Sequence, residues 1–110
     1  MEIDLTKDSR KVLVSLYKEY LEKVKSGCSK SQSREFNSNN LDFITGIHPD
    51  DVYECLLELK ANNLVTMNIL DDVTLTDIAI YEMENRIKKI LKNGLSCAID
   101  LLSLIPQLFS

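Results

Sequence analysis

The chain has 110 residues, of which 45% are hydrophobic and 27% charged, and its net charge is −4. This length corresponds to one domain, and this composition excludes a disordered or fibrous protein. The acidic balance argues against a protein that coats nucleic acid, which would be basic overall.

The first predicted helix covers residues 8–25. Asp8 or Ser9 is expected to cap its start, and Gly27 is expected to end it. Residues 26–40 are rich in Ser and Asn, so we predict a loop in which Phe36, on a short strand at 34–37, reaches the core. The apolar residues of the helix follow the i, i+3, i+4 spacing of one buried face: Val12, Leu13, Leu16, Tyr17, Tyr20, Leu21 and Val24.

The middle of the chain predicts a short helix, a turn and a longer helix. The short helix is expected at Leu41–Thr45 and the turn at Gly46. The longer helix begins at Pro49, with His48 as its N-cap and two aspartates in the first turn, where they complement the helix dipole. This helix is expected to end near residues 62–63, and its buried stripe comprises Val52, Cys55, Leu56 and Leu59.

A β-hairpin and two further helices are predicted after residue 63. Residues 64–69 and 73–75 alternate as paired strands do, with Asp71-Asp72 as the turn. A helix then starts at Thr76 or Asp77 and stops at Asn93-Gly94. A last helix, apolar on nearly all sides, is expected from 95 to 105. The helix that follows the hairpin is predicted to bury Ile80, Met83, Ile87, Ile90 and Leu91.

The order of these elements resembles that of a winged-helix domain. The helix-turn-helix core of winged-helix regulators resembles the run LDFITGIHPDDVYECLLELKANNLV, with Gly46 in the turn and Leu56, Leu59 and Leu64 at aliphatic positions. The run TLTDIAIYEMENRIKKIL is similar to the wing exit and the helix that follows it. The resemblance covers about residues 8–93 and extends, more loosely, to the small winged-helix proteins of bacteria and their phages.

This resemblance implies an α+β winged-helix fold, with a three-helix core and a β-hairpin wing in residues 1–93. Residues 94–110 would form a C-terminal helical extension. The resemblance also implies that the protein is a small DNA-binding transcriptional regulator. A three-helix bundle with an incidental hairpin is the alternative fold.

The charges along the chain favour a second function. Residues 35–84 carry eleven acidic residues and one basic residue, Lys60, whereas residues 7–34 carry eight basic and three acidic residues. The helix that enters the DNA groove in winged-helix regulators would here present His48, Asp50, Tyr53 and Glu54. Carboxylates repel phosphates, so these four residues, together with the acidic wing at Asp71-Asp72, are the candidate surface for a protein partner in a protein–protein interaction module that does not bind DNA.

If DNA is bound, the phosphate contacts are expected from the basic residues outside this acidic segment. The alternative is an ordinary solvated surface with ion pairs. The candidate contacts are Lys7, Arg10, Lys11, Lys30, Arg34, Lys88, Lys89 and Lys92.

We expect no enzymatic activity, no metal site and no cofactor. Three widely spaced cysteines, Cys28, Cys55 and Cys97, and the single His48 do not supply a structural zinc site. The sequence contains no Gly-rich phosphate loop and no nucleophile motif. Reduced cysteines and an acidic N-terminus without an apolar signal segment predict a cytoplasmic protein.

The C-terminal segment is expected to form a homodimer. Ten of the fifteen residues from 95 to 109 are apolar, too few to span a membrane. A helix that is apolar all round is buried on more than one side. Packing within one protomer and lying on a membrane surface are the alternatives. The candidate dimer seam, spaced by 4, 3, 4 and 3 residues, is Leu91, Leu95, Ala98, Leu102 and Ile105.

Overall fold

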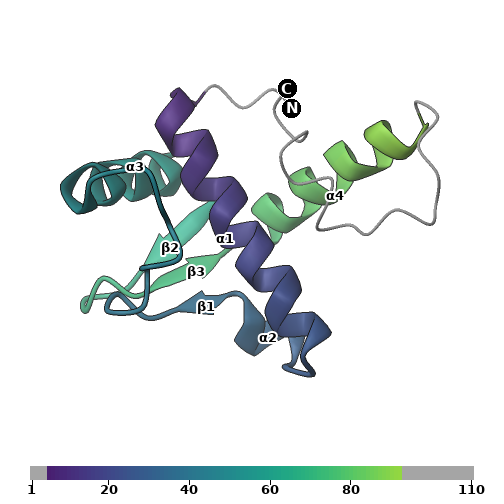
Figure 1. Ribbon diagram of the computed structural model, residues 1–110, viewed down its shortest axis with the longest axis horizontal. Helices are drawn as coiled ribbons and strands as arrows, with labels where there is room; N and C mark the ends of the chain where they lie inside the picture. The colour runs from purple at the N-terminus through teal and green to yellow at the C-terminus, as the bar shows by residue number, and fades with distance from the viewer. Residues whose placement is uncertain (1–4, 93–110) are drawn as a thin grey trace.

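Four helices and three short strands follow one another along residues 5–92, the part of the chain that the computed structural model describes. In chain order they are α1 (Lys7–Lys25), α2 (Lys30–Ser33), β1 (Glu35–Phe36), α3 (Pro49–Ala61), β2 (Val65–Met67), β3 (Val73–Leu75) and α4 (Asp77–Lys92). Helix α1 runs between α3 on one side and α4 on the other (Figure 1). The strands form one antiparallel sheet, so the described part has an α+β fold, as predicted.

Helix α1 confirms the predicted helix at 8–25, but its N-cap is different. Thr6 caps the helix, and its hydroxyl oxygen accepts a hydrogen bond from the Ser9 backbone N–H at 3.3 Å. Asp8 lies inside the first turn, and Ser9 is fully buried, so neither residue is the cap. At the other end, Gly27 has the left-handed φ of +105° that the predicted helix stop requires.

The Glu58 side chain, from α3, holds the start of α1. The Thr6 backbone N–H donates to Glu58 Oε1 at 2.8 Å, and the Ser9 hydroxyl donates to Oε2 at 2.8 Å. The Thr6 hydroxyl also lies 3.0 Å from Oε2. These bonds to the ionised carboxylate lower the pKa of Glu58. One carboxylate therefore joins two helices whose interacting residues are about fifty positions apart.

The stretch predicted as a loop contains the short helix α2. Ser29 caps it by accepting from the Gln32 N–H at 3.1 Å, and the Ser33 hydroxyl donates to the Ser29 carbonyl at 2.6 Å. Strand β1 follows and buries Phe36, as predicted. The Lys23 ammonium group lies 4.2 Å from the centre of the Phe36 ring, a cation–π contact that covers this end of the core.

The prediction of a helix at Leu41–Thr45 is wrong. This segment makes a single turn, in which the Ile44 N–H donates to the Leu41 carbonyl at 3.0 Å. Gly46 follows with a φ of +83°, which confirms the predicted sharp turn. Ile44 is buried, so the segment still reaches the core without forming a helix.

The three strands pair in the order β1-β3-β2. Val65 pairs with Leu75 and Met67 with Val73 in the hairpin, and Phe36 of β1 pairs with Val73 on the other side. Strand β2 is shorter than the predicted 64–69, because Asn68 already begins the turn.

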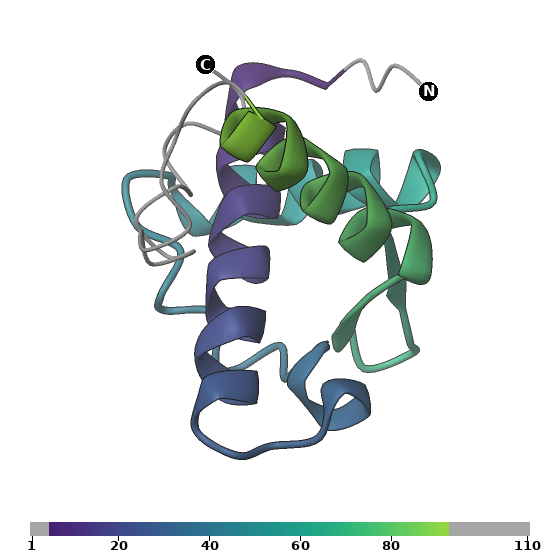
Figure 2. The same cartoon turned by 90° about the vertical axis from the view of Figure 1, so that its right-hand side faces the viewer.

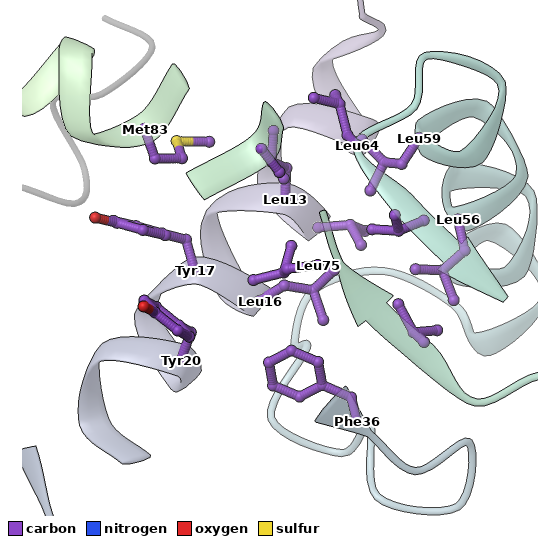
Figure 3. Packing of buried hydrophobic residues seen from close by; sticks show 14 of the residues in the cluster. Leu13, Leu16, Tyr17, Tyr20, Phe36, Leu56, Leu59, Leu64, Leu75 and Met83 are labelled. Atoms are coloured by element: carbon purple, nitrogen blue, oxygen red, sulfur yellow. The ribbon is translucent and has the colours of Figure 1, made fainter. Parts of the chain in front are cut away.

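The core lies between α1, α3, the sheet and α4 (Figure 3). Val52, Cys55, Leu56 and Leu59 of α3 are all buried, as the helical spacing predicts. Burial also raises the pKa of the Tyr17 phenol, and the nearby Glu84 carboxylate of α4 adds to the effect. Helices α1, α3 and α4 and the sheet therefore share one hydrophobic core.

Helix α4 starts where the sequence predicted. Thr76 caps it by accepting from the Ala79 N–H at 3.2 Å, and Ile80, Met83 and Ile87 are buried. The helix crosses α1 instead of running beside it (Figure 2). The side chains of Ile90 and Leu91, the helix predicted at 95–105 and the boundary at residue 93 lie outside the described residues.

Candidate functional site

The start of helix α3 is held by its own first residues. His48 is the N-cap, as predicted: its Nδ1 accepts from the Asp50 backbone N–H at 3.1 Å. Pro49 occupies the first turn, where its missing N–H is not needed. Asp50 and Asp51 lie at the positive end of the helix dipole. This capping leaves the side chains of His48 and Asp50 exposed, at 67% and 92%.

The four residues predicted as a partner surface lie together on the first two turns of α3 and its cap. His48, Asp50, Tyr53 and Glu54 are all exposed, and 44% of Tyr53 is accessible. The opposite side of α3 packs into the core. The structure therefore presents an aromatic ring among carboxylates on a firmly packed helix. We call the residues 48, 50, 51, 53 and 54 the acidic α3 face.

A pocket of about 410 Å³ lies beside the acidic α3 face, between α3, the 38–47 loop and the hairpin. Ile44, Val52 and Leu56 contribute buried apolar surface, and Leu41 and Met67 contribute partly buried surface. Such a volume falls in the range of about 300–1,000 Å³ typical of ligand pockets. The pocket does not follow from the sequence, because the segment that forms one of its walls, residues 41–45, was predicted to be a helix.

Two aspartates also line this pocket. Asp42 comes from the loop and Asp71 from the hairpin, and both are exposed. Among the described residues, neither carboxylate has a hydrogen-bond donor or a cation as partner. The pocket thus combines apolar lining with two uncompensated negative charges.

The tip of the hairpin is apolar, which corrects the prediction that Asp71-Asp72 form the turn. The turn residues are Ile69 and Leu70, which are 98% and 71% exposed. The Asn68 side-chain oxygen accepts from the N–H of Leu70 at 2.9 Å and from that of Asp72 at 3.0 Å. These bonds fix the turn, so both aliphatic side chains are held out in solvent.

Asp72 has a structural role in this turn. Its Oδ1 accepts from the Ser38 N–H at 2.9 Å, and its Oδ2 accepts from Asn68 Nδ2 at 3.3 Å. The Ser38 N–H, with the Asn68 amide, lowers the pKa of the Asp72 carboxyl. Asp72 thereby ties the 38–47 loop to the hairpin and keeps the pocket wall in place.

The structure does not gather the candidate phosphate contacts on one surface. Lys7, Arg10 and Lys11 lie on the first two turns of α1, with Arg10 half-buried. Lys88 and Lys89 are exposed on the last turns of α4, which point away from α1 (Figure 1). The remaining candidates lie elsewhere or outside the described side chains: Lys30 on α2, Arg34 beside β1, and Lys92.

Arg34 is engaged within the fold. Its guanidinium pairs with Asp77, the first residue of α4, and only 26% of its side chain is exposed. Burial raises the pKa of the Tyr20 phenol of α1, and the positive charge of Arg34 partly opposes this rise. Arg34 therefore joins α1, β1 and α4, and a phosphate contact would have to compete with Asp77.

Metal binding, membrane insertion and thiol chemistry each require specific features of residues 5–92, the described part of the chain. In that part of the chain, no group of three His, Cys, Asp or Glu side chains is arranged to hold a metal ion. None of its helices combines the length and the apolar character needed to cross a membrane. Cys28 and Cys55 are free thiols, and burial raises the pKa of Cys55, while Cys97 lies outside the described residues.

Comparisons with models of protein families, with curated protein sequences and with solved structures give no match to this chain.

Proposed function

We propose that residues 5–92 form a winged-helix domain in which the first helix of the helix-turn-helix is reduced to the turn at Leu41–Ile44. The strand order β1-β3-β2 and the position of α3 directly before the hairpin support this assignment. The alternative of a helical bundle with an incidental hairpin fits less well. Phe36, Val65 and Val73 of the sheet are buried in the same core as the helices.

We further propose that this domain is a non-catalytic protein-interaction module that binds its partner through the acidic α3 face. The observation that carries this proposal is the exposed Tyr53 among carboxylates, next to an apolar pocket. Aromatic residues with neighbouring apolar pockets dominate the binding energy of protein interfaces. In this domain, α3 occupies the position of the helix that enters the DNA groove in winged-helix regulators.

Electrostatics separate this function from insertion into a DNA groove. Residues 35–84 contain eleven acidic residues and only one basic residue, Lys60, which lies in the last turn of α3. Most non-specific DNA affinity comes from cations that neutralise phosphates. The acidic α3 face would repel the backbone that it had to approach first.

A capture experiment with full-length protein tests the proposal. The immobilised chain is exposed to a lysate of cells that carry it, and bound proteins are identified by mass spectrometry. We expect Tyr53→Ala/Glu54→Lys to lose a protein that the wild type retains. Glu22→Lys is the matched control, because it makes the same charge change on an exposed position of α1. Retention of the same proteins by the double variant would show the proposal to be wrong.

Nucleic-acid binding through α1 is the second candidate function. Lys7, Lys11, Lys18 and Lys25 are separated by 4, 7 and 7 residues, so they share one face of the helix, and all four are exposed. At 1.5 Å per residue this stripe is about 27 Å long. Such a stripe matches a phosphate backbone in charge without requiring the acidic α3 face to enter a groove.

Fluorescence anisotropy with mixed duplex DNA at two salt concentrations tests this second candidate. Salt-sensitive binding that is lost in Lys11→Glu/Lys18→Glu, or in Lys88→Glu/Lys89→Glu, would favour DNA and show which helix docks. The absence of binding at low salt would remove DNA from consideration.

A homodimer through Leu91, Leu95, Ala98, Leu102 and Ile105 is also proposed from the sequence. Leu95, Ala98, Leu102 and Ile105 lie outside the described residues, as does the side chain of Leu91.

A further inference from the structure

We propose that the pocket beside α3 receives an apolar side chain of the protein partner, and that Asp42 and Asp71 pair with Lys or Arg residues flanking that side chain. The proposal rests on the protein-interaction function and specifies the chemistry of the partner: a segment with an apolar anchor between basic residues.

The lining of the pocket supports the apolar anchor. Ile44, Val52 and Leu56 present aliphatic atoms that belong to the hydrophobic core. Met67 also lines the pocket, and a methionine side chain adapts its shape to an incoming group. A volume of about 410 Å³ leaves room for an aliphatic or aromatic side chain together with part of its backbone.

The two aspartates support the basic flanks. Asp42 and Asp71 come from two different walls of the pocket, the loop and the hairpin, and neither pairs with a cation among residues 5–92. Cations on either side of an inserted anchor would therefore meet a carboxylate each. Such charge complementarity selects the partner and speeds its association.

Two other occupants fit the same surface less well. A second copy docked through this face about a two-fold axis would bring the same acidic residues against each other. A small organic cation would fill the pocket alone, but the exposed apolar surface continues beyond it. Tyr53 lines the pocket from α3, and the exposed Ile69 and Leu70 lie on the hairpin between the pocket residues Met67 and Asp71. That extent matches a polypeptide segment.

The site is also held in shape before binding. Asp72 ties the loop to the hairpin, and Asn68 fixes the tip. A preorganised surface loses less conformational entropy when it binds, so more of the contact energy contributes to affinity.

Fluorescence anisotropy with labelled ten-residue peptides tests the inference on the full-length protein. The probe has a central Phe flanked by two Lys residues on each side, and two comparison peptides replace the Phe by Gly or the lysines by Glu. We expect the probe to bind and each comparison peptide to bind at least tenfold more weakly. Equal binding by the Gly peptide would overturn the apolar anchor, and equal binding by the Glu peptide would overturn the basic flanks.

Variants of the protein locate the binding site. Asp42→Asn/Asp71→Asn removes both charges, and Asn is tolerated at the left-handed φ of +62° at Asp71. We expect its affinity for the probe to fall about twofold to thirtyfold, the effect of two exposed ion pairs. The control Glu22→Gln/Glu84→Gln removes two exposed charges elsewhere and is expected to bind as the wild type does. Unchanged binding by the Asp42/Asp71 variant would overturn the inference.

The two proposals fail in distinguishable ways. If no peptide binds but Tyr53→Ala/Glu54→Lys still releases the captured partner, the pocket inference is wrong and the interaction function stands. If the probe binds at the pocket but partner capture does not depend on Tyr53 and Glu54, the acidic α3 face is not the docking surface and the proposed function is wrong.

Discussion

The carboxylate of Glu58 makes a sharp prediction about stability. It accepts from the Thr6 N–H and the Ser9 hydroxyl, both at 2.8 Å, and lies 3.0 Å from the Thr6 hydroxyl. Glu58→Ala removes these acceptors, and with them the hydrogen bonds that hold Thr6, the N-cap of α1. Hydrogen bonds to charged groups contribute about 1.5–3 kcal/mol, and an N-cap contributes about 1 kcal/mol. Because the site is partly open to water, we expect a loss of about 2 kcal/mol.

This loss corresponds to a fall in Tm of about 8–16 °C for a domain of this size. Glu58→Gln keeps one acceptor oxygen, so about half of the loss is expected. Chemical denaturation in urea, followed by circular dichroism, measures the free energy of unfolding of each variant. Glu54→Gln is the control, because Glu54 lies one turn earlier on α3 and is exposed. If Glu58→Gln unfolds with the same free energy as Glu54→Gln, the proposed role of this carboxylate is wrong.

The same carboxylate predicts a dependence on pH. Its pKa is lowered in the fold, mainly by the Thr6 backbone N–H, from an ordinary value of 4.5. A depressed pKa means that the stabilisation is complete above the unfolded value and is lost as pH falls through the folded value. The free-energy difference between wild type and Glu58→Gln should therefore be full at pH 7 and shrink below pH 4.5. A difference that stays constant from pH 7 to pH 3 would refute this reasoning.

Three further predictions concern the core, the hairpin and the C-terminal segment. Leu59→Ala, at a fully buried position, should cost about 3 kcal/mol in urea denaturation, whereas Leu57→Ala, at 42% exposure on the same helix, should cost less than about 1 kcal/mol. Asn68→Ala should speed hydrogen exchange at the amides that it holds in the hairpin turn, measured by NMR, because those amides lose their acceptor. Leu102→Asp should give a monomer or an insoluble protein in sedimentation, and a species unchanged from the wild type would refute the predicted dimer seam.

Hydrophobic spacing predicted the long helices of this chain correctly, because one face of each packs on the core. Val52, Leu56 and Leu59 of α3 are buried as the 3.6-residue period requires. The N-cap of α1 was assigned wrongly for a different reason. Asp8 and Thr6 are both good capping residues, so the sequence does not decide which of them is the N-cap. In the structure Thr6 is the N-cap, and its backbone N–H donates to Glu58, a residue from a distant part of the sequence.

Two of the errors, both within residues 26–45, concern segments of four or five residues. Helix nucleation is costly, so such short segments depend on local hydrogen bonds more than on periodicity. Ser29 and Ser33 supply those bonds for α2 in a stretch that reads as a loop. Leu41–Thr45 has no comparable cap bond in the structure and includes the β-branched Ile44 and Thr45, so a single turn forms there.

The segment at 41–45 also explains why the acidic α3 face could be predicted and the pocket could not. The exposure of Tyr53 and Glu54 follows from the helical period alone, since they alternate with Val52 and Cys55 on α3. The pocket depends on the path of the 38–47 loop, which is set by the bond from the Ser38 N–H to Asp72 and by the turn at Gly46. Asp42 and Asp71 are 29 positions apart, so only the folded loop and hairpin can place both of them on one pocket. The charge pattern predicts that the acidic α3 face does not contact phosphates, whereas the pocket beside this face follows only from tertiary contacts.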